Sequence, residues 1–269
     1  MELRDFALRV VRSESLEEKL SRPAGPVTDD NPGFPLRLDQ PGRPEGLKIS
    51  PSSSVRVPSR KGMVDPRQRV RILHAFANHE LQAVELFAWA ILAFPEAPGE
   101  FRSGLKQRVV EEQRHTRMYR SRLRELGSDL GAFPVSGYFW SKTRMLTTPA
   151  RFVCAMGLTF ENANLDHTTE FGALARSAGD EKTASLFEKV GEDEIAHVRF
   201  AVEWLERWKE PGQSLWEAYS ANVTWPLRGA LARGNQFDAG ARRSAGLDKE
   251  FISELARAER GDPSQRPGP

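Results

Sequence analysis

The segments Glu112-Gln-Arg-His115 and Glu194-Ile-Ala-His197 decide the fold, because each places a glutamate three residues before a histidine. Positions three apart lie on one face of a helix, so each segment can present an oxygen and a nitrogen ligand to one metal ion. One such pair alone is a weak signal, since glutamate is common on exposed helix faces as well. The weight of the two pairs therefore depends on what surrounds them.

Each pair follows another helical segment that carries its own glutamate. Glu80 precedes Glu112 by almost the same interval as Glu161 precedes Glu194. Glu194 follows Glu112 by the same number of residues as His197 follows His115. Glu161 follows Glu80 by one residue fewer. One glutamate from each of two helices, with Glu-x-x-His from each of the other two, is the ligand pattern of two-metal carboxylate four-helix bundles. The spacing therefore predicts an all-α, four-helix bundle with four glutamates and two histidines at one centre.

Two further acids, Glu85 and Asp166, lie close to the expected ligands. Glu85 is a rival first ligand, but its interval to Glu112 is too short to match the other half, so the repeat favours Glu80. The same repeat sets Glu85 opposite Asp166, each five residues after the first glutamate of its half. Five residues turn a helix about 140° beyond one full turn, so these acids leave the ligand face. We expect them either to orient a histidine ligand from behind or to bond solvent.

Capping residues and changes of composition divide the chain into three segments: residues 1–64, 65–210 and 211–269. The first contains a helix and an arm (residues 21–61) rich in proline, glycine and serine, which we expect to pack on the core, with a short extended piece at 54–57. The second contains the bundle, and the third is a C-terminal helical extension with a frayed tail from residue 261. The expected helices are 2–20, 66–94, 100–126, 149–179, 181–209, 214–224 and 247–260.

Composition limits the classes of function. The 39 basic and 37 acidic residues leave a net charge of +2, which is too even to indicate nucleic-acid binding by charge alone. One cysteine, Cys154, excludes an internal disulfide framework and fits a reducing compartment. The N-terminus lacks the apolar stretch of a signal peptide, and the apolar run at 86–94 is too short to cross a membrane. We therefore expect a cytoplasmic protein without a membrane partner.

At these motifs the chain resembles the ferritin-like superfamily. It is most similar to an uncharacterised bacterial family of unknown function with a His-Glu-Leu-x-Ala-x-Glu-Leu motif, here at residues 79–86, followed by two Glu-x-x-His motifs. The resemblance extends from Asp5 to Trp208. It implies metal ligation by six residues, with Glu112 and Glu194 bridging the metals: Glu80, Glu112, His115, Glu161, Glu194 and His197. A more distant similarity is to the bacterial di-iron hydroxylase that modifies an adenosine in tRNA.

Two functional interpretations of the metal site follow from these motifs, beside a third in which a binding or structural module retains the site for stability alone. The first is an O₂-activating oxidoreductase, an oxygenase or oxidase with two metal ions, either iron–iron (Fe/Fe) or manganese–iron (Mn/Fe). Its partners would be O₂, a small-molecule or modified-nucleoside substrate, and an electron donor. The second is a metal-binding or ferroxidase-type protein without an organic substrate. Either interpretation is compatible with a homodimer, and neither identifies a catalytic residue beyond the metal ligands.

Overall fold

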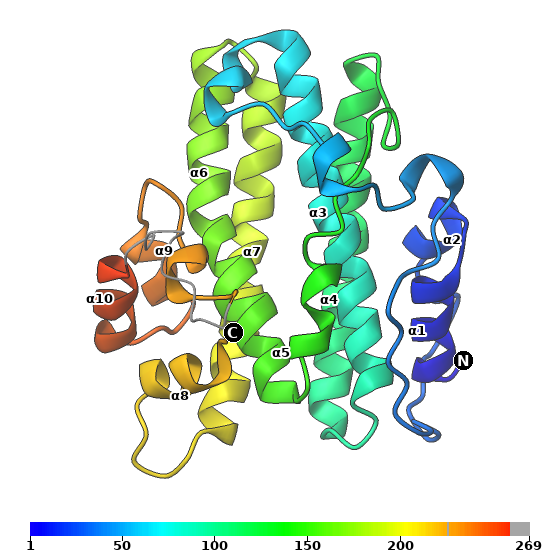
Figure 1. Cartoon of the computed structure of the whole chain (residues 1–269), viewed down its shortest axis with the longest axis vertical. Coiled ribbons are helices and arrows are strands. Elements are labelled where there is room, and N and C mark those ends of the chain that lie inside the picture. The colour runs from blue at the N-terminus through cyan, green and yellow to red at the C-terminus, as the bar shows by residue number, and fades with distance from the viewer. Residues whose placement is uncertain (225, 259–269) are drawn as a thin grey trace. The chain divides into compact units, whose positions relative to one another are not determined.

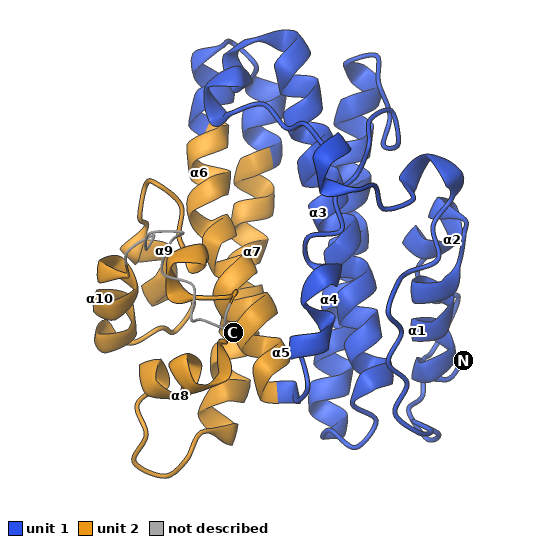
Figure 2. Ribbon diagram, viewed as in Figure 1, with its two compact units in different colours: residues 1–149, 173–186 blue, residues 150–172, 187–269 orange. Residues whose placement is uncertain are grey.

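The computed structural model describes residues 1–224 and 226–258 (Figure 1). All regular elements among these residues are helical, and the only β pairings described are two isolated bridges, Glu2–Thr28 and Ile49–Val135. The expected all-α class is confirmed, whereas the ferritin-like bundle stays a prediction. None of the helices described is long and apolar enough to cross a membrane. The chain divides into two compact units, which Figure 2 distinguishes by colour: unit 1 is residues 1–149 and 173–186, and unit 2 is residues 150–172 and 187–269.

Unit 1 begins with two short helices, α1 (Leu3–Arg12) and α2 (Leu16–Leu20). The sequence predicted one helix over 2–20, and this prediction is wrong at residues 13–15. The Ser15 side chain accepts a hydrogen bond from the Glu18 amide and so starts a new helix there. The break allows Lys19 of α2 to turn back and donate to the carbonyl oxygens of Val10 and Val11.

The main hairpin of unit 1 consists of α3 (Pro66–Ala93) and α4 (Gly99–Glu125), which pack against each other. The Asp65 side chain accepts from the amides of Arg67 and Gln68, and Pro66 occupies the first turn, where a missing N–H does no harm. Gly127 follows α4 with a φ of 76°, the left-handed conformation that ends a helix most readily at glycine. Both helices lie within a residue or two of their predicted bounds, and almost all of α3 after Arg71 is buried.

The arm at residues 21–61 makes hydrogen bonds to both α1 and α3. The Leu36 amide donates to the Leu92 carbonyl, and the Trp89 indole donates to the Leu38 carbonyl over 3.1 Å. Val55 has the extended conformation expected at 54–57, whereas Ser54 belongs to one of several short helical turns in the arm. The turns that precede α3 are η1 (Glu45–Leu47), η2 (Ser52–Ser54) and η3 (Arg60–Val64). A further one, η4 (Trp140–Met145), lies in the segment after α4.

Unit 2 is formed around parts of the second pair of long helices. The helix expected at 149–179 is interrupted: α5 (Pro149–Ala155) leads into a π-helix, η5 (Met156–Glu161), and then into α6 (Asn162–Ser177). The partner helix is α7 (Glu181–Trp208), whose first turn Asp180 caps through the Thr183 amide, as predicted. The boundary between the units passes through α6 and α7.

The C-terminal segment of unit 2 is helical, as predicted, but in more pieces. Its elements are α8 (Leu215–Asn222), η6 (Gly229–Ala232), α9 (Ala239–Ser244) and α10 (Lys249–Arg257). A reciprocal pair of hydrogen bonds between Ser214 and Glu217 starts α8. The sequence predicted α8 and α10 but not the short α9. The tail predicted to fray, with the last residues of the expected 247–260 helix, lies outside the described residues.

Candidate metal-binding sites

Unit 1 brings together three of the six predicted ligands, which we call the first ligand set: Glu80 of α3 with Glu112 and His115 of α4. The His115 Nδ1 atom lies 3.5 Å from Glu80 Oε2 and 3.4 Å from Glu112 Oε2. The three residues each offer a ligand atom within 4.8 Å of the others, and their exposed fractions do not exceed 2%. The α3–α4 hairpin therefore holds two carboxylates and one imidazole at distances that a single small ion can span.

Unit 2 repeats this arrangement with the second ligand set: Glu161, Glu194 and His197. Glu161 ends the π-helix η5, and the other two lie on α7. The His197 Nδ1 atom is 3.3 Å from Glu194 Oε2 and 3.9 Å from Glu161 Oε2, and all three residues are buried. The Asn164 amide donates to Glu194 Oε1 over 3.1 Å, which fixes that carboxylate.

Both sets contain carboxylates that are poorly stabilised as anions by the chain itself. Burial, then the neighbouring Glu112 carboxylate, raises the pKa of Glu80 to about 8. Burial, then Glu161, raises the pKa of Glu194 well above its ordinary value. Among the described residues, Glu80 Oε1 and Glu194 Oε2 accept no hydrogen bond, although His197 Nδ1 lies 3.3 Å from Glu194 Oε2. A buried carboxylate in this state needs either a proton or a bound cation.

The oxygen and nitrogen donors fit a first-row transition metal. Carboxylate oxygens suit manganese and iron, and imidazole nitrogens suit iron, copper and zinc, whereas neither set contains the thiolates that select softer ions. Cys154, the only cysteine, is buried and belongs to neither set. The residues present therefore fit the predicted iron–iron or manganese–iron pair.

The π-helix places Glu161 in a way that the sequence did not indicate. The Thr159 hydroxyl, two residues before Glu161, lies 2.8 Å from the Cys154 carbonyl and 2.9 Å from the Tyr219 hydroxyl of α8. At Gly157 an added Cβ would lie 2.2 Å from the Cβ of Ala201 on α7, so only glycine permits this approach. The sequence signal that could have indicated this irregularity is Gly157, a glycine inside a predicted helix. π-Helical turns inside α-helices occur frequently at functional sites.

Glu85 does not bond solvent, which was one of the two roles expected for it. Its side chain is fully buried, which excludes bonding to solvent. Its oxygens accept from the Arg43 guanidinium over 2.7–3.2 Å and from the Trp140 indole over 2.8 Å, while Lys19 Nζ lies 3.2 Å away. These cations hold the pKa of the Glu85 carboxyl below its ordinary value despite its burial. Glu85 therefore anchors the arm and α2 to α3.

Asp166 has the corresponding anchoring role in unit 2, and its full burial likewise excludes the expected bonding to solvent. The Arg242 guanidinium of α9 makes a two-pronged contact with it over 2.7 and 2.9 Å. The amides of Gly234 and Asp238 donate to the same carboxylate over 2.8 and 2.7 Å. Each half therefore uses an acid five residues beyond its first ligand to hold an added segment. Arg43 and Arg242 do not belong to the repeat that relates the two pairs of long helices, so no spacing in the sequence indicated their roles.

These features define a class: an all-helical protein with two buried sets of two glutamates and one histidine, each with the composition of a metal site. Residues 5–253 match the family described as "Protein of unknown function (DUF455)", so the chain belongs to that family. No curated protein and no solved structure matches the chain.

Proposed function

We propose that each ligand set binds one metal ion and that the protein is a two-metal carboxylate protein. The observation that carries this proposal is the pair of buried carboxylates, Glu80 and Glu194, each with an oxygen that accepts no hydrogen bond among the described residues. A bound cation would replace both the missing donors and the proton that a raised pKa otherwise requires.

The ligand chemistry supports iron or manganese as the bound ions. An iron–iron pair is the first candidate and a manganese–iron pair the second, because both ions accept mixed carboxylate and imidazole ligands. Calcium is disfavoured, since it prefers six to eight oxygen ligands and imidazole is a poor donor to it.

The reaction that we propose is oxidation of an organic substrate with O₂. When bound, a redox-active metal pair would supply the electrons that activate O₂. The chain's own residues hold the ligands and keep water away: both histidines are buried, and Asn164 fixes one carboxylate. The ferritin-like relationship inferred from the ligand pattern supports this class of reaction by analogy alone.

Metal content tests the first part of the proposal. Elemental analysis after anaerobic Fe(II) loading should return two ions per chain for the wild type and about one each for Glu80→Gln and Glu194→Gln. The matched control is Glu192→Gln, which changes an exposed glutamate of the same helix, α7, and should retain two ions. A wild-type protein that holds one ion or none would refute the two-metal proposal.

Oxygen consumption tests the reaction. The Fe(II)-loaded protein is compared with and without a cell metabolite extract, and the extract is then searched for an oxidised product. Consumption that depends on the extract and yields a product supports the oxidoreductase. Rapid turnover of added Fe(II) that no extract alters would instead establish a ferroxidase.

A further inference from the structure

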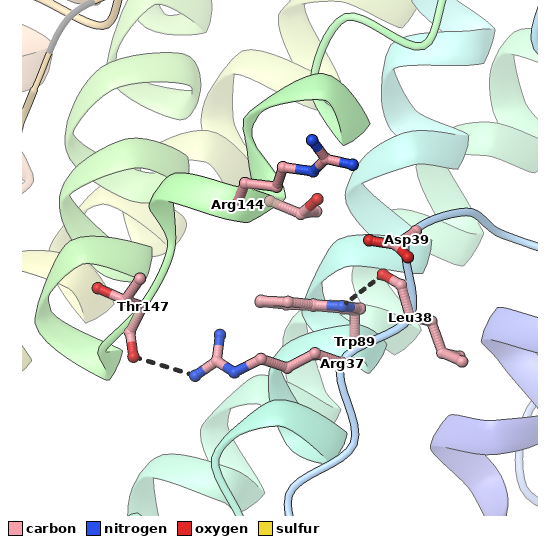
Figure 3. A pocket seen from close by; sticks show the side chains of 7 residues that line it. Arg37, Leu38, Asp39, Trp89, Arg144 and Thr147 are labelled. Atoms are coloured by element: carbon pink, nitrogen blue, oxygen red, sulfur yellow. Dashed lines mark hydrogen bonds between the residues drawn. The ribbon is translucent and has the colours of Figure 1, made fainter.

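Unit 1 contains a cavity of about 260 Å³ (Figure 3). Three parts of the chain line it: the arm at residues 37–39, Trp89 of α3, and residues 143, 144 and 147 in and after η4. Trp89 follows Glu80 by nine residues, which is two and a half turns of helix. The cavity therefore lies on the face of α3 opposite to the Glu80 ligand, and it is distinct from the first ligand set.

Arg37 forms one wall of this cavity and is held in a fixed position. Its guanidinium donates to the carbonyl oxygens of Leu146 and Thr147 over 2.9 and 3.0 Å. It also lies over the rings of Trp89 and Phe94, at 5.5 and 5.0 Å from their centroids. All of these partners are neutral, so no residue in the described part of the chain pairs with the positive charge of Arg37.

Arg144 supplies a second positive charge, and in Figure 3 it lies on the other side of the Trp89 ring from Arg37. Its side chain is exposed at the mouth of the cavity, and within residues 1–224 and 226–258 its guanidinium makes no hydrogen bond and no ion pair, so it is free to bind a ligand. The single acid of the lining, Asp39, likewise forms no ion pair in the part of the chain described. Two arginines and one aspartate leave the cavity with a net positive charge.

The remaining lining combines apolar surface with one available hydroxyl. The ring of Trp89 and the side chain of Leu38 form apolar walls. The Thr143 hydroxyl already donates to the Trp140 carbonyl, whereas the Thr147 side chain makes no hydrogen bond among the described residues. The cavity thus offers a forked cationic donor, a hydroxyl and a carboxylate acceptor around a small apolar space.

We propose that this cavity binds a small organic molecule with an oxyanion group, a phosphate or a carboxylate. Arg144 would donate to the oxyanion in the two-pronged geometry that guanidinium favours, with Thr147 as a further donor. Asp39 would accept from a hydroxyl or amino group elsewhere on the molecule. The volume lies below the roughly 300–1,000 Å³ of sites for drug-sized ligands, so the ligand is smaller than a nucleotide.

Binding of simple oxyanions tests the proposal. Inorganic phosphate, methyl phosphate and acetate are titrated into the wild-type protein by calorimetry at constant ionic strength, adjusted with chloride. Saturable binding of a phosphate probe or of acetate supports the site, and the tighter of the two identifies the oxyanion. Absence of saturable binding by all three probes would overturn the proposal.

Variants separate this site from general attraction of anions to a basic surface. Arg144→Gln removes one charge from a side chain that supports no other group, and it should weaken binding by roughly tenfold or more. Thr147→Val, a second probe of the cavity, should weaken it less. The matched control is Arg12→Gln, because Arg12 is exposed on α1 and forms no ion pair among the described residues. Equal weakening by Arg12→Gln and Arg144→Gln would refute a specific site.

Discussion

Replacement of Glu85 by glutamine should strongly destabilise the protein. The wild-type carboxylate is fully buried, accepts hydrogen bonds of 2.7 and 2.8 Å from Arg43 and Trp140, and lies 3.2 Å from Lys19 Nζ. Glutamine keeps the volume but leaves the two buried cations without a counter-charge. Loss of one partner from a buried ion pair costs about 3–5 kcal/mol, a large part of the ~5–15 kcal/mol that separates folded from unfolded domains.

The effect should also depend on pH with a defined sign. Burial lowers the pKa of Lys19 in the folded protein, and Glu85 opposes that shift, so the variant lowers it further. Between the lowered pKa of the folded state and the ordinary pKa of 10.5, Lys19 is protonated in the unfolded chain more than in the folded chain. The free energy of unfolding therefore rises with pH in that window. The variant should therefore regain part of its lost stability as the pH rises toward 10.5.

At acid pH the difference in stability between the wild type and Glu85→Gln should decrease for another reason. The folded pKa of Glu85 lies below its ordinary value of 4.5, so the carboxylate stabilises the wild type fully above pH 4.5. That contribution is lost as the pH falls through the folded pKa, where the wild type also loses the charge. The difference between wild type and variant is thus largest near neutral pH.

Urea unfolding monitored by circular dichroism at pH 3, 7 and 9.5 measures these differences. The matched control is Glu45→Gln, which removes a carboxylate paired with Lys48 on the surface of the arm and should leave the midpoint unchanged. A Glu85→Gln protein with the wild-type midpoint at pH 7 would refute the anchoring role. So would a loss of stability that does not vary with pH.

Three further predictions concern other buried groups. Burial lowers the pKa of His74 to about 4, so stability should fall as the pH drops from 6.5 toward 4. His74→Gln can still accept a hydrogen bond from the Gly131 amide, and urea unfolding should show that this variant lacks the pH dependence. Gly157→Ala should lower the free energy of unfolding by about 1–3 kcal/mol, because the new methyl group meets Ala201, and thermal unfolding measures this loss. Hydrogen bonds outweigh the effect of burial and lower the pKa of Asp180 to about 2. The Asp180 carboxylate therefore stabilises the fold above pH 3.8 and ceases to do so toward pH 2. Thermal unfolding of Asp180→Asn should differ from that of the wild type at pH 6 and converge with it at pH 2.

The long helices could be predicted from the sequence because their signals are local. Pro66 and Gly127 mark helix ends by their own backbone preferences, and Asp180 caps a helix through an amide three residues away. The division of the six candidate ligands into two sets followed from regular spacing, since a helix brings residues three apart to one face. Their binding of metal stays a prediction.

The roles of Glu85 and Asp166 could not be predicted because their partners are remote in the chain. Arg43 lies 42 residues from Glu85, and Arg242 lies 76 residues from Asp166, each in a segment without periodicity. Their exit from the ligand face was predicted correctly, but helical rotation alone does not say which segment covers a side chain. The break at residues 13–15 was different, since Ser15 followed by Glu18 was a readable capping signal.

The two anchored carboxylates determine how much of the gene is needed to express a stable protein. A fragment of residues 65–210, the bundle segment suggested by the sequence, would retain both acids and lose both arginines. Glu85 and Asp166 would then lose the cations that pair with them, and the apolar side chains of α3 that the arm covers would become exposed and favour inclusion bodies. A soluble expression clone must therefore start before residue 19 and end after residue 242, although none of the six candidate metal ligands lies near either limit.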